Sequence, residues 1–148
     1  MQLILVGFIF LINFFAISAP MIFKKNMVVV LTHGRLAGKK AVVLKIIAEE
    51  YILVGGINRL PYKIEEYMSI QEKMKAEKFL TFIKKINIKH TIATRYIVEI
   101  DTNSIDLTID IKNLTKKAEL NKKINIEFKK LFENKKDHFL FNSIAITP

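Results

Sequence analysis

Three short runs rich in β-branched residues restrict the fold of this chain more than any other feature of its sequence. They are Asn26–Leu31, Lys39–Ile47 and Tyr51–Val54. Valine, isoleucine and tyrosine favour strands, and polar or glycine-containing segments separate the runs. Short strands at such close spacing are typical of a small all-β barrel or sandwich.

Glycines mark the ends of these runs. Gly34 and Gly38 lie between the first and the second run, and we expect both to serve a turn, since positive φ is cheap only for glycine. A Walker-type phosphate loop would need four residues between the glycines and a hydroxyl at the position of Lys40, so a tight β-turn is the better interpretation. We also predict that Gly55-Gly56 closes the third strand.

The later part of the chain mixes strands with helices. Ile64–Ala76 has a modest helical pattern, while Phe79–Ile88 and Tyr96–Ile100 are predicted strands. The clearest helix is Leu114–Phe132, with Asn113 as its expected N-cap. Its apolar face is predicted to contain Leu114, Ala118, Ile124, Phe128 and Leu131.

Residues 1–20 form a separate apolar segment without a charged residue, MQLILVGFIFLINFFAISAP. The length suits a marginal membrane helix or a signal-peptide core, and Ala16-Ile17-Ser18 fits a small-x-small cleavage site. The positive n-region of a signal peptide is missing, because no Lys or Arg precedes Lys24. A third interpretation is that Met21 is the natural start.

The remaining residues are strongly basic. The chain has 24 Lys+Arg against 14 Asp+Glu, and the whole net charge of +10 lies on residues 21–148. Three blocks, residues 24–45, 73–95 and 112–136, each carry +6 and alternate with acidic blocks. Such a domain is suited to phosphate or anionic lipid. Cysteine is absent, which excludes disulfides, thiolate zinc sites and cysteine nucleophiles.

The sequence contains no catalytic constellation, so we predict neither an enzyme nor a cofactor or metal site. His33, His90 and His138 lack the spacing of a helical metal site, and we expect surface or base-stacking roles for them. The stretch Phe82–His90, followed by Thr94-Arg95-Tyr96, combines lysines with stackable rings, which suits irregular RNA. A half-buried strand with a lysine-rich outer face is the alternative.

Three segments resemble known proteins. Met27–Lys45, MVVVLTHGRLAGKKAVVLK, resembles a KOW motif, the strand–turn–strand unit of SH3-like barrels in many ribosomal and transcription proteins. Leu53–Lys63, LVGGINRLPYK, resembles the stretch LVAGIDRYPRK of the eukaryotic large-subunit ribosomal protein twenty-seven family. Phe82–Tyr96 ends in HTIATRY and resembles that family's NHLMPTRY segment. The order and spacing of the segments agree with the family.

The sequence also departs from the family pattern. The loop Ala48–Glu50 is short, Tyr62 stands where the family has a base, and Ala93 stands where it has a proline. Arginine is scarce, which leaves fewer bidentate contacts to phosphate. The family has no hydrophobic leader, and this favours Met21 as the start.

The resemblance implies an α+β fold, a small SH3-like β-barrel (KOW motif) with later strands and a basic C-terminal α-helix. We divide the chain into an apolar leader (1–20), the barrel with its extension (21–111) and the helix with its tail (112–148). The implied function is that of a structural constituent of the large ribosomal subunit in the cytoplasm, assembled in the nucleolus, with rRNA and neighbouring ribosomal proteins as partners. The expected RNA-binding residues are Arg35, Lys39, Lys40, Lys45, Arg59, Lys63, Lys84, Lys85, Lys89, His90, Arg95, Lys116, Lys117, Lys122 and Lys123.

Two other functions fit the sequence. A membrane-anchored or exported basic protein would use residues 1–20 as they stand, and the mass of the endogenous N-terminus tests this alternative. A KOW-type transcription elongation factor would share the barrel, and it would co-sediment with polymerase rather than with ribosomal subunits.

Overall fold

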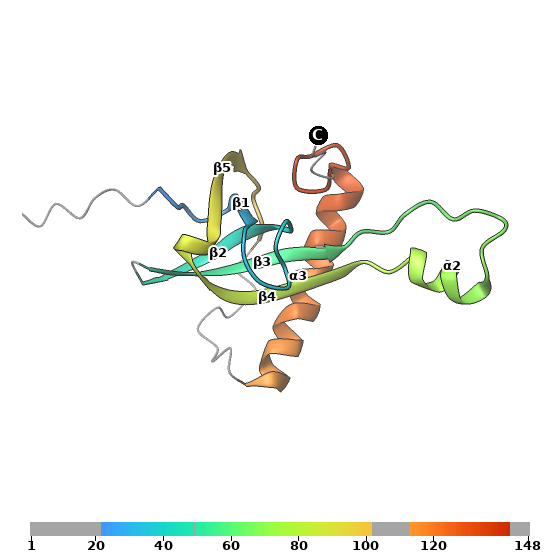
Figure 1. Cartoon of the computed structure of the whole chain (residues 1–148), viewed down its shortest axis with the longest axis horizontal. Coiled ribbons are helices and arrows are strands. Elements are labelled where there is room, and N and C mark those ends of the chain that lie inside the picture. The colour runs from blue at the N-terminus through green and yellow to red at the C-terminus, as the bar shows by residue number, and fades with distance from the viewer. Residues whose placement is uncertain (1–21, 49, 102–112, 143–148) are drawn as a thin grey trace, which may run out of the picture.

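A five-stranded antiparallel sheet forms the body of the molecule, and a long helix lies against one of its faces (Figure 1). The computed structural model describes residues 22–48, 50–101 and 113–142. The strands follow the order β4-β3-β2-β1-β5 in the sheet. Their bounds are Met27–Leu31 for β1, Lys40–Ala48 for β2, Tyr51–Arg59 for β3, Leu80–Asn87 for β4 and Thr91–Ile97 for β5.

The predicted α+β class with an SH3-like sheet is confirmed, but the barrel is not closed. β4 and β5 lie at opposite edges of the sheet, although only the short 3-10 helix η1 (Ile88–His90) separates them in sequence. The chain thus curls back at η1 without joining the two edges by a strand pair. The free edge of β4 is the one that matters for the candidate site.

The β1–β2 loop is a glycine turn. Gly34 and Gly38 have φ angles of +83° and +77°, in the left-handed region that favours glycine. The amide of Gly38 donates to the carbonyl of Leu31 at 2.7 Å, and the amide of Ala37 donates to the carbonyl of Gly34 at 3.0 Å. Both glycines therefore serve the backbone of this loop.

The prediction that Gly55-Gly56 ends the third strand is wrong, because β3 continues through both residues to Arg59. Packing requires a glycine at position 56. A Cβ atom on Gly56 would lie 2.8 Å from the Cβ of Ala41 and would also overlap the ring of Phe82 on β4. Glycine here lets the neighbouring strands and the Phe82 ring approach β3 closely.

Helix α3 (Leu114–Asn134) completes the hydrophobic core on one face of the sheet. Leu120, Ile124 and Phe128 are its buried residues, and they pack in one cluster with side chains of β2, β3 and β4. A second cluster, which includes Val29, Val43 and Ile52, fills the opposite face of the sheet. The sheet is therefore buried on both faces, and the helix shares its core.

The predicted helix Leu114–Phe132 is confirmed with two additional residues, but its buried face differs from the prediction. Leu114 and Ala118 are exposed, and Leu120 lies in the core in their place. The first turns of α3 extend past the edge of the sheet, where no strand of the described chain covers them (Figure 1). Asn113 is the N-cap residue, although its side chain makes no capping hydrogen bond.

The predicted strand Tyr96–Ile100 is wrong at both ends: the observed strand starts five residues earlier, at Thr91, and ends three residues earlier, at Ile97. β5 spans Thr91–Ile97 because its partner β1 begins at Met27, which pairs with Ile97. Asn26 lies just before β1 with a φ angle of +68°; its amide donates to the Val43 carbonyl and its carbonyl accepts the Val98 amide, both at 2.8 Å. After β5, Val98 and Ile100 are buried in the core cluster that also contains side chains of α3 and the tail.

An arm, residues 61–78, projects from the body between β3 and β4 and carries the short helix α2 (Ile70–Ala76) (Figure 1). The predicted helix Ile64–Ala76 is thus shorter than expected. It starts after Ser69, whose hydroxyl accepts from the Glu72 amide at 3.3 Å, while the Glu72 carboxylate accepts from the Ser69 amide at 2.9 Å. This capping box sets the first turn of the helix.

Within the described residues, no helix has the length and apolar character needed to cross a membrane. The apolar segment 1–20 and the predicted boundary between residues 111 and 112 lie outside the described residues.

Candidate nucleic-acid interface

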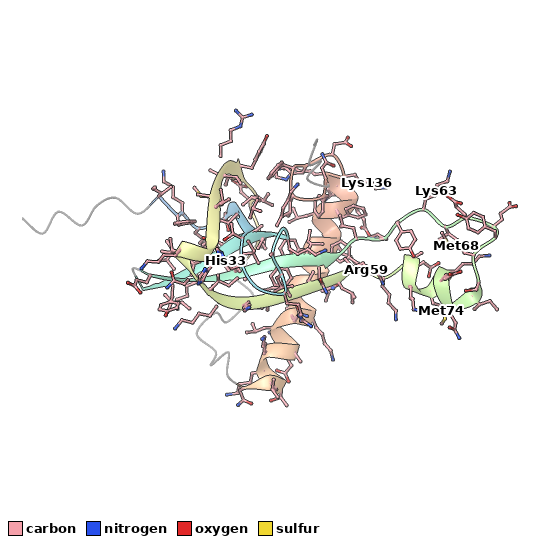
Figure 2. All side chains as sticks on the ribbon, in the orientation of Figure 1. His33, Arg59, Lys63, Met68, Met74 and Lys136 are labelled. Atoms are coloured by element: carbon pink, nitrogen blue, oxygen red, sulfur yellow. The ribbon has the colours of Figure 1, made fainter. Side chains whose placement is uncertain are left out.

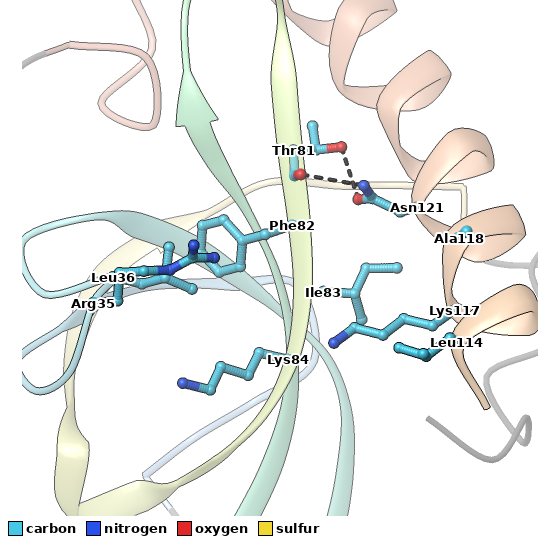
Figure 3. A pocket seen from close by; sticks show the side chains of 10 residues that line it. All are labelled: Arg35, Leu36, Thr81, Phe82, Ile83, Lys84, Leu114, Lys117, Ala118 and Asn121. Atoms are coloured by element: carbon cyan, nitrogen blue, oxygen red, sulfur yellow. Dashed lines mark hydrogen bonds between the residues drawn. The ribbon is translucent and has the colours of Figure 1, made fainter. Parts of the chain in front are cut away.

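Side-chain amides of α3 cover the first half of the free β4 edge. Asn121 donates from Nδ2 to the Thr81 carbonyl at 3.2 Å and accepts the Thr81 hydroxyl at 2.9 Å (Figure 3). One turn later, Asn125 donates to the carbonyl of Phe79 at 3.0 Å. These bonds satisfy outward-facing groups of an edge strand and hold α3 at a fixed distance from β4.

A hollow of about 440 Å³ remains between the β1–β2 loop, β4 and the exposed start of α3 (Figure 3), and we call it the helix groove. Three cations from separate elements, Arg35, Lys84 and Lys117, border it, and the half-buried ring of Phe82 lies beside Arg35. None of the described residues that line it is acidic. They are Arg35, Leu36, Thr81, Phe82, Ile83, Lys84, Leu114, Lys117, Ala118 and Asn121.

A second hollow of similar volume adjoins the first, and we call it the histidine groove. It shares Leu36 and Lys84 with the helix groove. The rings of His33 and His90 lie 4.7 Å apart between centroids at its border. Its lining residues, again without an acid, are Leu31, His33, Gly34, Leu36, Tyr51, Lys84, Lys85, Ile86, Asn87 and His90.

A backbone hydrogen bond and a cation–ring contact position the aromatic groups of the histidine groove. The amide of Thr32 donates to the carbonyl of His90 at 3.0 Å, which ties the β1–β2 loop to η1 and brings the two histidines together. The Lys85 ammonium lies 4.6 Å from the ring centroid of Tyr51 on β3. Cation and ring are therefore presented side by side, as a surface that takes phosphates and stacked bases requires.

The structure brings five of the predicted RNA-binding residues together and leaves most of the others apart. Arg35, Lys84, Lys85, His90 and Lys117 line the two joined grooves. Arg59 lies at the base of the arm and Lys63 on the arm itself (Figure 2). The remaining residues, apart from Lys40, are exposed on the loop, the strands, η1 and the helix: Lys39, Lys45, Lys89, Arg95, Lys116, Lys122 and Lys123.

Lys40 does not have the exposed position that an RNA contact requires. Its relative exposure is 6%, and its ammonium donates to the carbonyls of Phe139 and Asn142 in the tail that follows α3. The same group lies 3.8 Å from the ring centroid of Phe139, which stacks on Tyr96. Burial lowers the pKa of Lys40. The residue therefore fastens the tail to β2, and we leave it out of the proposed interface.

Sequence analysis missed several groove residues. No local sequence pattern marked Tyr51 or Asn121 as a groove residue, because the residues beside them in the structure come from distant parts of the chain. Phe82 and His33 did have a signal, since the first belongs to the basic and aromatic stretch and the second to the set of expected base-stacking histidines. The pairing of His33 with His90 depends on the curl of the chain at η1, which no local pattern reveals.

Comparison with known families shows to which family the chain belongs. A model of the Ribosomal L27e protein family matches residues 28–147. The chain belongs to this family. The match covers β1 to α3 with both grooves, and it confirms the resemblance inferred from the KOW-like segment and the two further stretches.

Individual L27e relatives are similar over most of their length. "Large ribosomal subunit protein eL27" of Pyrobotrys stellatus is 34% identical over 119 residues, which cover 76% of this chain and 85% of the relative. "Large ribosomal subunit protein eL27A" of Schizosaccharomyces pombe is 28% identical over 131 residues, or 83% and 96% of the two chains. The Pisum sativum "Large ribosomal subunit protein eL27" is 27% identical over 128 residues, or 82% and 95%.

Membership in the L27e family also bears on the predicted chemistry. The family is one of ribosomal proteins, so the prediction that the chain is not an enzyme is confirmed by its relatives. It likewise favours the ribosomal interpretation over a transcription elongation factor. In the described part of the chain, no group of three or more His, Asp or Glu side chains could hold a metal ion.

Proposed function

We propose that this L27e protein is a structural constituent of the large ribosomal subunit and that it binds rRNA through the helix groove and the histidine groove. The main support for this proposal is that the two hollows adjoin each other and form one continuous surface. Arg35, Lys84, Lys85 and Lys117 supply its positive charge, and among the described residues no acidic side chain lines either groove. We also propose cytoplasmic ribosomes as its place of action, after assembly in the nucleolus.

The chemistry of the two grooves suits irregular RNA rather than a regular duplex. Lysine ammonium groups and the Arg35 guanidinium neutralise phosphates, and they do so from three elements that surround a hollow. The rings of Phe82, Tyr51 and the histidine pair are close to these cations and offer faces on which unpaired bases stack. The held position of α3 keeps Lys117 opposite Lys84, so both sides of the helix groove reach one RNA segment.

We further propose that residues 21–148 act as one RNA-binding unit that begins at Met21. The prediction divides this part into 21–111 and 112–148, and two observations support their joint action. The helix shares the core of the sheet through Ile124 and Phe128, and it supplies one wall of the helix groove.

The proposal is tested by the binding of the purified full chain to protein-free large-subunit rRNA at several salt concentrations. If about eight phosphates are neutralised, the log–log slope of affinity against salt is roughly −6. The double variant Lys84→Gln/Lys117→Gln should bind about tenfold more weakly, with a slope smaller by about 1.4, because two phosphate contacts are lost.

The matched control is Lys24→Gln/Lys25→Gln, which removes the same charge from two exposed lysines before β1. We expect it to change the affinity less than twofold. Equal losses in both variants would show that net charge alone drives binding, and an unchanged affinity of the groove variant would refute the proposed interface.

A further inference from the structure

The arm exposes an unusual amount of apolar surface for so short a segment. The relative exposures of Tyr67, Ile70 and Met74 are 82%, 79% and 63%, and Tyr62 and Ile64 are also exposed. Ile70 and Met74 lie four residues apart on α2, and Tyr67 belongs to the turn that precedes the helix. Such a group of large apolar side chains at the end of a projection is typical of a binding surface.

One backbone hydrogen bond and one capping box fix the arm without using the side chains of Tyr67, Ile70 and Met74. The amide of Tyr62 donates to the carbonyl of Ala76 at 3.1 Å, which closes the loop, and the capping box at Ser69 and Glu72 sets the helix. Ala76 is the buried residue of α2 and faces the base. Met74 extends away from the body, and the whole arm lies apart from the sheet (Figure 2).

The charge of the arm differs from that of the rest of the chain. Residues 61–78 contain four lysines and four glutamates, so the whole formal charge of +10 lies outside the arm. Glu65 and Glu66 directly precede Tyr67 in the sequence, and Glu72 lies in the first turn of α2. Carboxylates in this position repel phosphates, and they complement basic side chains.

From these observations we propose that the arm docks through Tyr67, Ile70 and Met74 onto another protein of the large subunit, at an apolar hollow bordered by basic side chains. The inference rests on the proposed function, because that function brings the arm into the subunit. Three large apolar side chains would supply the buried centre of the contact, and the glutamates would form its polar border. The arm could instead contact rRNA, but the carboxylates of Glu65 and Glu66 beside Tyr67 would repel its phosphates.

Photocrosslinking in intact large subunits tests this inference directly. Tyr67 is replaced in the full chain by a photoreactive phenylalanine, purified subunits are irradiated, and the product is treated separately with RNase and with protease. We expect a crosslink that survives RNase, with a lysine- or arginine-rich peptide of a ribosomal protein as its partner. A crosslink to rRNA, or no crosslink at all, would overturn the inference.

The same photoreactive residue at position 84 separates the two proposals. There we expect a crosslink to rRNA, since Lys84 borders both grooves. Failure at position 84 alone contradicts the rRNA interface, and failure at position 67 alone contradicts the docking of the arm.

Two variants of the arm give an independent measurement. Tyr67→Gln/Ile70→Gln/Met74→Gln should keep its affinity for protein-free rRNA within twofold, and its retention on large subunits after a salt wash should fall about fivefold. Glu65→Lys/Glu66→Lys should bind protein-free rRNA more tightly and yet remain less well on subunits. Unchanged or improved retention of either variant would overturn the inference.

Discussion

The two grooves and the arm show how differently one chain can arrange the same residue types. The grooves collect cations from the β1–β2 loop, β4 and α3 around hollows that no acidic side chain of the described ranges lines. The arm balances its lysines with glutamates and exposes apolar side chains instead. The basic block 73–95 contributes to both, because Lys73, Lys75 and Lys78 belong to the arm while Lys84 and Lys85 belong to the grooves. A basic block in the sequence therefore does not by itself show which of its lysines share a binding surface, because the fold places them on different parts of the molecule.

Filling the space at Gly56 should have the largest effect and should abolish the grooves while leaving the arm's local structure intact. A side chain at this position would overlap the Phe82 ring and meet the Ala41 Cβ at 2.8 Å, so β4 would have to move away from β3. We expect Gly56→Val to destabilise the chain by about 3 kcal/mol or more. Thermal denaturation measures this loss.

Gly34→Val is the matched comparison, since a Cβ atom there would meet nothing within 4 Å. We expect Gly34→Val to destabilise the chain by about 1–3 kcal/mol, through the positive φ angle alone. A larger loss at Gly34 than at Gly56 would contradict the packing argument for β3.

Charge reversal should sharpen the contrast in RNA binding. We expect Lys84→Glu/Lys117→Glu to weaken binding to protein-free rRNA about 100-fold, because two phosphate contacts become repulsive. Lys73→Glu/Lys75→Glu makes the same change of net charge on α2 and should weaken it no more than about threefold, through the long-range field alone. Filter binding at one fixed salt concentration compares the two variants. Similar losses would mean that the arm contacts RNA as the grooves do.

The smallest expected effect concerns the tail beside Lys40, which lies away from both the grooves and the arm. Burial lowers the pKa of His138, with Lys135 and Lys40 contributing, and its Nδ1 accepts the amide of Leu140 at 3.1 Å. The unfolded chain therefore binds this proton more readily than the folded chain. Stability should be constant above the ordinary histidine pKa of about 6.5 and should fall as the pH drops below it.

Because the site is partly exposed, we expect this loss to lower the melting temperature by no more than about 2 °C. His138→Gln should remove the decrease between pH 7 and pH 5, as seen by thermal denaturation at closely spaced pH values. A melting temperature that rises on acidification in the native chain, and not in this variant, would reverse the assigned direction.

Sequence patterns located most elements because their causes are local. β-Branched runs predicted β1, most of β2 and all of β4, and the 3.6-residue periodicity predicted α3 within two residues of its end. The failures have long-range causes. Gly55 and Gly56 resembled a turn because glycine is rare inside strands, but at Gly56 the ring of Phe82 from the neighbouring strand occupies the space of a side chain.

The candidate site was predictable to a smaller degree. Lysines beside rings in Phe82–His90 indicated an RNA surface, and five of the expected residues do line the grooves. Lys40 looked like its exposed neighbour Lys39, and only the position of the tail shows that its ammonium is held by two carbonyls.

The sequence by itself determined the family, the basic character, the strand-rich first half and the glycine turn at Gly34 and Gly38, because these depend on composition, motif and the conformational limits of single residues. Only the tertiary structure shows which lysines share a hollow, which one is buried, and that the segment between β3 and β4 leaves the body as an arm with exposed apolar side chains. Those properties arise from contacts between residues far apart in the chain. Such contacts form only when the sheet curls at η1 and α3 packs across it.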